Sequence, residues 1–325
     1  MQIAVVALCT FVLALVFGRL LIPTLRALKA GQSIREIGPS WHNSKAGTPT
    51  MGGIMFIAAA ILCVVAAGWR SMLAGYRTHL YVLAFALVFG LIGFIDDFVK
   101  VKFKRNLGLP ALQKLVLQLA AAGAYLALLR YNGDLTCDLY IPFWNVSFEI
   151  NWIVYLIFAM FVIVGCVNAV NLTDGIDGLA SGVTLPVMVF FAVTAWMWGK
   201  TTLALLPAAL AGGLAGFLVY NFHPAKVFMG DTGSLFLGGM VCGLAFALDM
   251  PLVLILVGII YIMETVSVIM QVTYFKLTHG KRIFRMTPIH HHFEMGGWSE
   301  EKIFTVFVGI TVLMCILAFI GVSGR

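Results

Sequence analysis

The chain has 325 residues, of which 61% are hydrophobic and only 11% are charged. Soluble domains carry roughly 25% charged residues, so this composition excludes a water-soluble fold and predicts that lipid covers most of the surface. The net charge of +7 does not indicate a nucleic-acid-binding protein, because the basic residues are strung between long apolar runs and form no single patch. Five of the six cysteines lie inside apolar runs, so we expect free thiols and no zinc site.

Ten segments are apolar enough to cross a bilayer as helices, each of which needs about 20 predominantly apolar residues. We therefore predict an all-α, polytopic membrane protein in which residues 1–325 form a single transmembrane catalytic domain. The eighth segment is the weakest, because its glycines dilute its hydrophobicity. The predicted spans are 2–22, 51–69, 79–95, 112–130, 152–170, 180–198, 202–220, 234–249, 251–275 and 303–322.

Basic residues are distributed unevenly between the two sides that these spans define. The loops after the odd-numbered spans hold Arg26, Lys29, Arg35, Lys45, Lys100, Lys102, Lys104, Arg105, Lys226, Lys276, Lys281, Arg282, Arg285 and Lys302. The opposite side holds only Arg70, Arg77, Arg130, Lys200 and Arg325. Cytoplasmic loops carry the excess of Lys and Arg, so the richer side is predicted to be cytoplasmic and both termini extracytoplasmic. The unusual polar groupings share the richer side, which predicts an active-site cleft there.

Asp96 and Asp97 end the third predicted span. Two adjacent carboxylates beside a bilayer repel each other unless a divalent cation or protons are shared between them. A solvated helix end is the alternative, although the helix dipole disfavours acidic residues at a C-terminus. Lys100 begins a run of lysines that suits phosphate or anionic lipid.

The fifth predicted span runs into a second polar stretch. Asn168 and Asn171 are three residues apart and share a helix face. Asp174 and Asp177 follow, and the glycines between and after them predict a turn or re-entrant bend. These four polar side chains would then converge at the same end of the fifth span.

Asp231 lies at the start of the eighth span in Gly-Asp-Thr-Gly-Ser. Exposed backbone N–H groups at a helix N-terminus favour either an anion or an N-cap role for such a residue. The nearby Phe228 is either a membrane-interface aromatic or a platform for a flat ring. Residue pattern alone leaves both alternatives open.

Three consecutive histidines, His290, His291 and His292, precede the last span. They cannot all face one way on a helix or strand, and they lack the i, i+4 spacing of a helical zinc pair. Near the arginines of the same loop, they suit phosphate binding or movement of phosphate protons. Glu264 is ionisable at membrane depth in the ninth span, where function and pairing between helices remain open alternatives.

These groups together favour chemistry on phosphates carried by a lipid. Phosphoryl transfer needs mainly alignment and neutralisation of charge, which Mg²⁺ and cationic side chains provide. A proton-coupled carrier that uses Glu264 and the histidines is the alternative from another functional class.

Five motifs resemble those of the bacterial phospho-N-acetylmuramoyl-pentapeptide transferases. The acidic motifs are shared across the wider superfamily of polyprenyl-phosphate N-acetylhexosamine-1-phosphate transferases, whereas the triple-histidine block is similar to this branch specifically. The motifs are SKAGTPTMGG at 44–53, GFIDDFVK at 93–100, NAVNLTDGIDGLA at 168–180, NFHPAKVFMGDTGSL at 221–235 and PIHHHFE at 288–294.

The resemblance implies a reaction and a setting. In this family, phospho-N-acetylmuramoyl-pentapeptide passes from UDP-N-acetylmuramoyl-pentapeptide to undecaprenyl phosphate, which gives lipid I and UMP with Mg²⁺ as cofactor. It also implies ten helices in the lipid bilayer of the bacterial cytoplasmic membrane and a homodimer. A sister enzyme that transfers N-acetylglucosamine-1-phosphate to the same lipid is the nearest alternative.

The resemblance also assigns roles to residues. Asp231 corresponds to the Mg²⁺ ligand and Asp96 and Asp97 to essential carboxylates, with Asp96 chosen as the base for the lipid phosphate. His290, His291 and His292 correspond to the histidine block, and His291 is our choice for substrate contact. Phe228 would stack on uracil, Asp177 would read its edge with the backbone around Leu172 and Gly175, and Lys100 and Lys114 would meet phosphate. The other residues expected to line the cleft are Lys45, Thr50, Asn168, Asn171, Asp174, Asn221 and Gln271.

Overall fold

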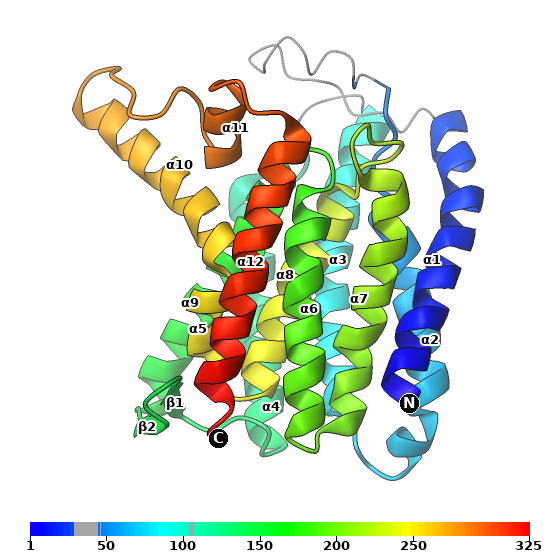
Figure 1. The fold of residues 1–325 in the computed structure, drawn as a ribbon. Helices are drawn as coiled ribbons and strands as arrows, with labels where there is room; N and C mark the ends of the chain where they lie inside the picture. Colours follow the sequence, from blue (N-terminus) through cyan, green and yellow to red (C-terminus); the bar gives the residue numbers. More distant parts are fainter. Residues whose placement is uncertain (29–44, 46, 104–106) are drawn as a thin grey trace.

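The computed structural model describes residues 1–28, 45, 47–103 and 107–325 (Figure 1). Ser44 and Ala46 of the first motif, and Lys104 and Arg105 of the basic run, lie outside these residues. Within the described part, nine helices are long and apolar enough to cross a membrane, and a bent pair makes a tenth span possible. The prediction of an all-α, polytopic membrane protein with about ten spans is confirmed.

The helices follow one another with short connections, and one small hairpin interrupts them. The long helices are α1 (Gln2–Ala27), α2 (Gly53–Leu73), α3 (Thr78–Phe103), α4 (Ala111–Tyr131), α5 (Trp152–Thr173), α6 (Leu179–Met197), α7 (Thr201–Asn221), α8 (Gly230–Ala247), α10 (Ile259–Leu277) and α12 (Glu300–Val322). The short ones are η2 (Pro251–Val253), α9 (Leu254–Val257) and α11 (Ile289–Glu294). Both chain termini lie at one end of the bundle, and α11 lies at the other (Figure 1).

Local capping explains where two of the helices begin. The Asn151 side chain accepts a hydrogen bond from the Ile153 N–H at the start of α5, and Ser299 does the same for Lys302 at the start of α12. Glu300 is one of two acidic residues in the first turn of α12, where it complements the helix dipole.

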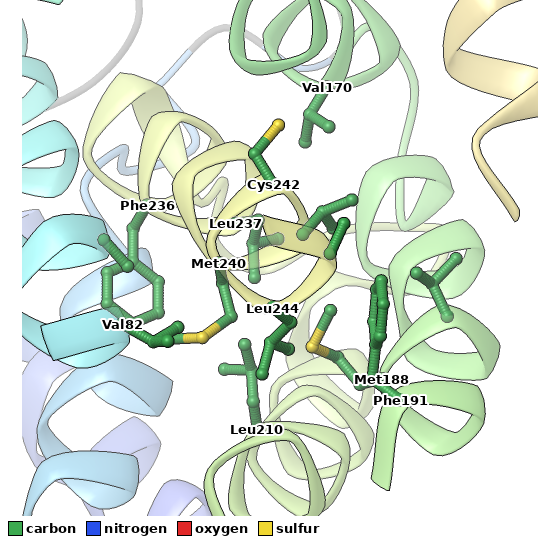
Figure 2. Close-up of a cluster of buried hydrophobic side chains, with 14 of the residues drawn as sticks. Val82, Val170, Met188, Phe191, Leu210, Phe236, Leu237, Met240, Cys242 and Leu244 are labelled. Carbon is green, nitrogen blue, oxygen red and sulfur yellow. The ribbon is translucent and has the colours of Figure 1, made fainter. Parts of the chain in front are cut away.

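Helix α8 is the centre of the bundle. Every residue from 232 to 250 is buried, and Figure 2 shows Met240 and Leu244 of α8 among Val82 of α3, Leu210 of α7 and Phe191 of α6. Neighbouring helices rather than lipid surround α8, so it does not need the hydrophobicity of a lipid-facing span. This position explains why α8 is the weakest span by hydropathy, and it begins at Gly230, four residues before the predicted start.

Glycines let the central helices approach closely. A Cβ atom on Gly212 of α7 would collide with the carbonyl of Ala7 on α1, and one on Gly216 would lie 2.7 Å from the carbonyl oxygen of Phe11. On α8, a Cβ on Gly239 would lie 3.1 Å from Cα of Ala86 in α3. Glycines four residues apart in apolar helices commonly allow such close helix packing.

The ninth span is not the continuous helix that we predicted over 251–275. It is broken into a short first part, η2 and α9, and the longer α10, with a bend of 82° between them. Gly258, at φ −98° and ψ 13°, ends α9. Helix α10 consequently slants away from the bundle toward the end where α11 lies (Figure 1). Hydropathy does not reveal the break, because both parts are apolar.

Two further features differ from the sequence expectation. Helix α3 continues to Phe103, so Asp96 and Asp97 lie within the helix and not at its C-terminus, and the dipole argument does not apply to them. The connection between α4 and α5 contains an antiparallel hairpin, β1 (Asp138–Ile141) with β2 (Val146–Glu149), which we did not predict.

Candidate active site

Three carboxylates gather where α3 meets the N-terminus of α8. Asp96 and Asp97 come from α3, and Asp231 comes from the first turn of α8. Each offers one oxygen such that the three atoms lie within 4.8 Å of one another. Asp96 and Asp97 are each only 3% exposed. Like charges at this separation and burial require compensating positive charge.

Two lysines provide that charge. The Lys100 Nζ lies 2.6 Å from an Asp96 carboxylate oxygen, 3.0 Å from Asp231 and 4.0 Å from Asp97. The Lys114 Nζ, from α4, lies 3.0 Å from the same Asp231 oxygen. Two ammonium groups against three carboxylates leave one net negative charge when all five groups are ionised. The cluster therefore suits a further cation.

Asp97 caps helix α8 from a neighbouring helix. Its carboxylate accepts hydrogen bonds from the backbone N–H of Asp231 at 3.2 Å, and from the N–H and hydroxyl of Thr232 at 2.9 and 2.7 Å. Helix N-termini leave such N–H groups without partners inside the helix. Gly93 permits this approach, because a Cβ there would collide with the Asp231 carbonyl. Asp97 thus holds the turn that carries Asp231.

Asp96 has a different environment on the same helix. One of its oxygens accepts a hydrogen bond from the Leu109 N–H at 2.8 Å, and the other pairs with Lys100. A Cβ on Gly108 would collide with this carboxylate, so the chain before α4 closes directly over Asp96.

Of the two asparagines of α5, Asn171 contacts this cluster and Asn168 contacts a side chain of α4. The Asn171 amide donates to Asp231 at 2.9 Å and to the Ser234 hydroxyl at 2.7 Å. One turn earlier, the Asn168 amide donates to the Gln118 side chain and to the Val164 carbonyl, both at 2.8 Å. We did not single out Gln118 from the sequence, although an amide four residues after Lys114 in an apolar helix was the available signal.

The turn between α5 and α6 confirms the predicted bend after Asn171. Gly178 adopts φ 75°, the left-handed region that favours glycine, and α6 begins at the next residue. Burial, together with the carboxylates of Asp231, Asp97 and Asp177, raises the pKa of Asp174 in this turn to about 8. The Asp174 side chain therefore binds a proton near neutral pH.

Asp177 belongs to a second polar cluster that joins distant parts of the chain. Its carboxylate accepts hydrogen bonds from Lys45 at 2.8 Å and from the Ala225 N–H at 2.9 Å, and it contacts His223 Nδ1 at 3.0 Å. Glu300, at the start of α12, contacts Lys45 at 2.7 Å and accepts from the Asp177 N–H at 3.0 Å. His223 and Glu300 were not among our predicted site residues, because only the fold brings them to Asp177.

The chain around Phe228 is held against the segment that precedes α2. The Phe228 N–H donates to the Pro49 carbonyl, and the Phe228 carbonyl accepts from the Gly52 N–H, both at 2.8 Å. The Asn221 side chain donates to the Val227 carbonyl at 2.9 Å. Thr50 is 8% exposed and lies beside Gly230, where a Cβ would be 2.7 Å from its hydroxyl. This packing ties Thr50 and Phe228 to the start of α8.

The three histidines have three different partners. His290 Nδ1 lies 3.0 Å from a Glu264 oxygen, and both side chains are fully buried. His291 Nδ1 lies 2.8 Å from Glu294, and His292 Nδ1 accepts a hydrogen bond from the Arg285 backbone at 3.2 Å. The prediction that they cannot face one way is confirmed. Glu264 thus makes a contact between α10 and α11, which is one of the two alternatives for this residue.

Histidine and glutamine contacts join α10, α11 and the turn after α5. A Cβ on Gly175 would collide with the His290 ring, so α11 packs directly on this turn beside Leu172 and Asp174. Gln271 of α10 accepts hydrogen bonds from the Ile283 and Phe284 N–H groups at 3.1 and 2.9 Å. Gln271 thereby holds the loop that leads from α10 to the histidines.

Comparison with known proteins defines the class first. Residues 79–249, more than half of the chain, match the family model of glycosyl transferase family 4. The fold, and a site whose charged residues suit phosphate chemistry, therefore define a multi-pass membrane transferase of that class. Residues 45–57 match the phospho-N-acetylmuramoyl-pentapeptide-transferase signature 1.

Full-length relatives identify the branch within that class. Phospho-N-acetylmuramoyl-pentapeptide-transferases from Caldanaerobacter subterraneus subsp. tengcongensis and Thermoanaerobacter sp. strain X514 are 47% and 48% identical, over 99% of this chain and 99% of their own lengths. The enzyme of that name from Clostridium beijerinckii is 48% identical over 96% of this chain and 94% of its own. The chain belongs to the phospho-N-acetylmuramoyl-pentapeptide-transferase family, and the resemblance seen in the motifs is confirmed.

Proposed function

We propose that this protein transfers phospho-N-acetylmuramoyl-pentapeptide from its UDP-linked donor to undecaprenyl phosphate, which yields lipid I and UMP. Its family membership supports this reaction over transfer of N-acetylglucosamine-1-phosphate. The observation that carries the proposal is the buried cluster of Asp96, Asp97 and Asp231 with Lys100 and Lys114, at one end of a membrane bundle. Both reactants are anions, and a divalent cation held by these carboxylates, together with Lys100 and Lys114, would offset their repulsion.

The carboxylate cluster fits the Mg²⁺ cofactor that the family resemblance implies. Three carboxylates within 4.8 Å offer the oxygen ligands that a hard divalent cation prefers, and the two lysines leave one negative charge uncompensated. We propose Asp231 as the ligand, because its side chain is 18% exposed, against 5% for Asp96 and 4% for Asp97. A bound Mg²⁺ would neutralise phosphate charge and polarise the reacting phosphoryl group.

The different contacts of Asp96 and Asp97 support a division of roles. Asp97 is engaged by three donors at the start of α8, whereas Asp96 accepts one backbone hydrogen bond and pairs with Lys100. We therefore assign to Asp96 the removal of the proton from the lipid phosphate. The lipid phosphate oxygen then attacks the sugar-linked phosphorus of the donor, the bond from that phosphorus to the UMP oxygen breaks, and UMP leaves with the electron pair.

Direct attack is preferred here over a phospho-enzyme formed on an aspartate. An aspartate that holds a metal is a poor nucleophile, and Asp97 is already occupied as a helix cap. The two routes differ when the lipid acceptor is left out. A phosphorylated protein isolated after incubation with the UDP-linked donor alone would contradict direct attack.

For the nucleotide and sugar, we propose the cleft formed by the turn after α5 and the loops before α2, α8 and α12. Phe228 would stack on uracil, and Asp177 would read the uracil edge with the backbone near Leu172 and Gly175. The contact of Lys45 with Asp177 supports a shared role at this position. The histidine block would contact substrate through His291. The other residues proposed to line the cleft are Thr50, Asn168, Asn171, Asp174, Asn221 and Gln271.

The protein is a multi-pass membrane protein, and we propose that it lies in the bacterial cytoplasmic membrane, which its family membership supports. We propose that the carboxylate cluster faces the cytoplasm, because the basic loops gather on that side. We also propose a homodimer, as the family resemblance implies.

The deciding experiment measures UMP release by the purified protein with undecaprenyl phosphate and each sugar nucleotide, with and without Mg²⁺. We expect turnover with UDP-N-acetylmuramoyl-pentapeptide, loss of turnover when Mg²⁺ is chelated, and loss in Asp231→Asn. Turnover only with UDP-N-acetylglucosamine would contradict the proposal. Substrate flux into liposomes that survives Asp231→Asn would instead support the proton-coupled carrier.

A further inference from the structure

Glu294 holds the histidine that we propose to contact the substrate. On α11, Glu294 lies three residues after His291, and its Oε2 is 2.8 Å from His291 Nδ1. Both side chains are largely buried, with 4% of Glu294 and 12% of His291 exposed. Each neighbouring histidine has a different partner, namely Glu264 for His290 and the Arg285 backbone for His292. Within the block, the His291 contact is thus a local carboxylate–imidazole pair on one short helix.

A carboxylate on Nδ1 controls the chemistry of the whole ring. It accepts the Nδ1 hydrogen in both the neutral and the charged ring, which fixes the tautomer and the ring orientation. The nitrogen that can exchange a proton with a phosphate, or donate a hydrogen bond to it, is then Nε2. A carboxylate this close also stabilises the charged imidazolium, the form that attracts a phosphate most strongly.

We propose that Glu294 is a positioning residue for the reaction, which acts through His291 by fixing its tautomer, orientation and charge. The inference rests on the proposed function, because only that function gives His291 a substrate to contact. Glu294 itself touches the imidazole and not the reacting atoms. Its contribution should therefore disappear when His291 is replaced.

The kinetic test is a double-mutant cycle on the full-length protein with UDP-N-acetylmuramoyl-pentapeptide and undecaprenyl phosphate. Glu294→Gln keeps the size of the side chain and removes its charge. We expect it to lower kcat about tenfold or more, as is usual for a residue that orients a reacting histidine, with KM for each substrate within about threefold. In the His291→Gln background, the same change should cost less than about twofold. Glu294→Asp, which keeps the charge, should retain more activity than Glu294→Gln.

The matched control is Glu149→Gln at the exposed end of β2, which should leave kcat unchanged. An unchanged kcat in Glu294→Gln would overturn the inference. So would a loss of kcat in the double variant that equals the product of the losses in the two single variants. A lower melting temperature together with an equal loss of kcat in Glu294→Gln and Glu294→Asp would also overturn it, since that result would indicate a purely structural role.

A spectroscopic arm separates this inference from the proposed function. In the ¹⁵N spectrum of histidine-labelled protein, the His291 signal is assigned by its absence in His291→Gln. Glu294→Gln should shift the Nδ1 resonance of His291 and leave that of His292 in place. An unshifted resonance would overturn the inference even if the enzyme is active. A shifted resonance in a protein that releases no UMP would instead contradict the proposed function alone.

Discussion

The contacts of the two adjacent aspartates predict that they stabilise the protein to different extents. Asp97→Asn and Asp96→Asn each remove one charge from the same cluster, so the relief of repulsion largely cancels in their comparison. Two differences remain. Asp96→Asn loses the close ion pair with Lys100, which keeps Asp231 as a partner at 3.0 Å, and the two aspartates differ in hydrogen bonding. Asp97 accepts three hydrogen bonds at the N-terminus of α8, whereas Asp96 accepts one from Leu109. We therefore expect Asp97→Asn to be the more destabilising variant.

The magnitude follows from the three donors. An amide oxygen at position 97 can still accept from Thr232, but the amide nitrogen then faces the Asp231 N–H and leaves it without an acceptor. A buried donor left unsatisfied costs about 1–3 kcal/mol, and loss of a helix cap costs about 1 kcal/mol. These values place the net difference at about 2 kcal/mol, and at about 2–4 °C for each kcal/mol Asp97→Asn should melt about 4–8 °C below Asp96→Asn.

Thermal unfolding of both variants in the same detergent measures this difference. Hydrogen exchange provides a local control, because the amides of Asp231 and Thr232 should exchange faster in Asp97→Asn than in Asp96→Asn. Equal melting temperatures, or a lower one for Asp96→Asn, would show that Asp97 does not act as the cap of α8.

Three further predictions concern the same region. Gly230→Ala should lower the melting temperature more than Gly199→Ala, because both glycines have positive φ but only a Cβ at Gly230 would meet Asp97 and Thr50; equal losses would refute the packing argument. Folding raises the pKa of Asp174 from 3.8 to about 8. The contribution of Asp174 to the free energy of unfolding is therefore complete below pH 3.8 and is lost as the pH rises through 8. The melting temperature of Asp174→Asn relative to wild type should therefore rise between pH 5 and pH 8, and a constant difference across that range would contradict the shift. Among the described residues, Lys114→Gln leaves Lys100 as the one lysine beside the three carboxylates. We therefore expect the KM for the donor to rise about tenfold and Mg²⁺ to bind more tightly. An unchanged KM would show that Lys114 does not bind the donor phosphates.

Much of the local geometry of the candidate site was predictable because its residues lie in short stretches of sequence. Asn168 and Asn171 share a helix face by their spacing, and each contacts a polar side chain of a neighbouring helix, Gln118 of α4 and Asp231 of α8. The glycines after Asp174 and Asp177 predicted a turn, which is present. Three adjacent histidines implied three different directions, and His290, His291 and His292 have three different partners. Such inferences succeed because local geometry alone decides them.

Contacts between distant segments could not be predicted from local sequence patterns. Lys45, Asp177 and Glu300 meet although 255 residues separate the first from the last. The pairing of Asp97 with the start of α8 spans 135 residues. Neither Asp97 nor Glu300 carries a local signal that names its partner, since an acidic residue near a helix end has many possible partners.

The sequence by itself determined that this is a membrane protein of about ten helices with its polar chemistry on one side, because span length and residue charge are properties of each segment alone. The tertiary structure decided which helix is central, where the ninth span bends, and which of two adjacent aspartates caps α8. Hydropathy compares a segment with water and cannot distinguish lipid from other helices as its surroundings, so α8 was the weakest span by sequence and is the most buried in the bundle. Only packing separates these two environments.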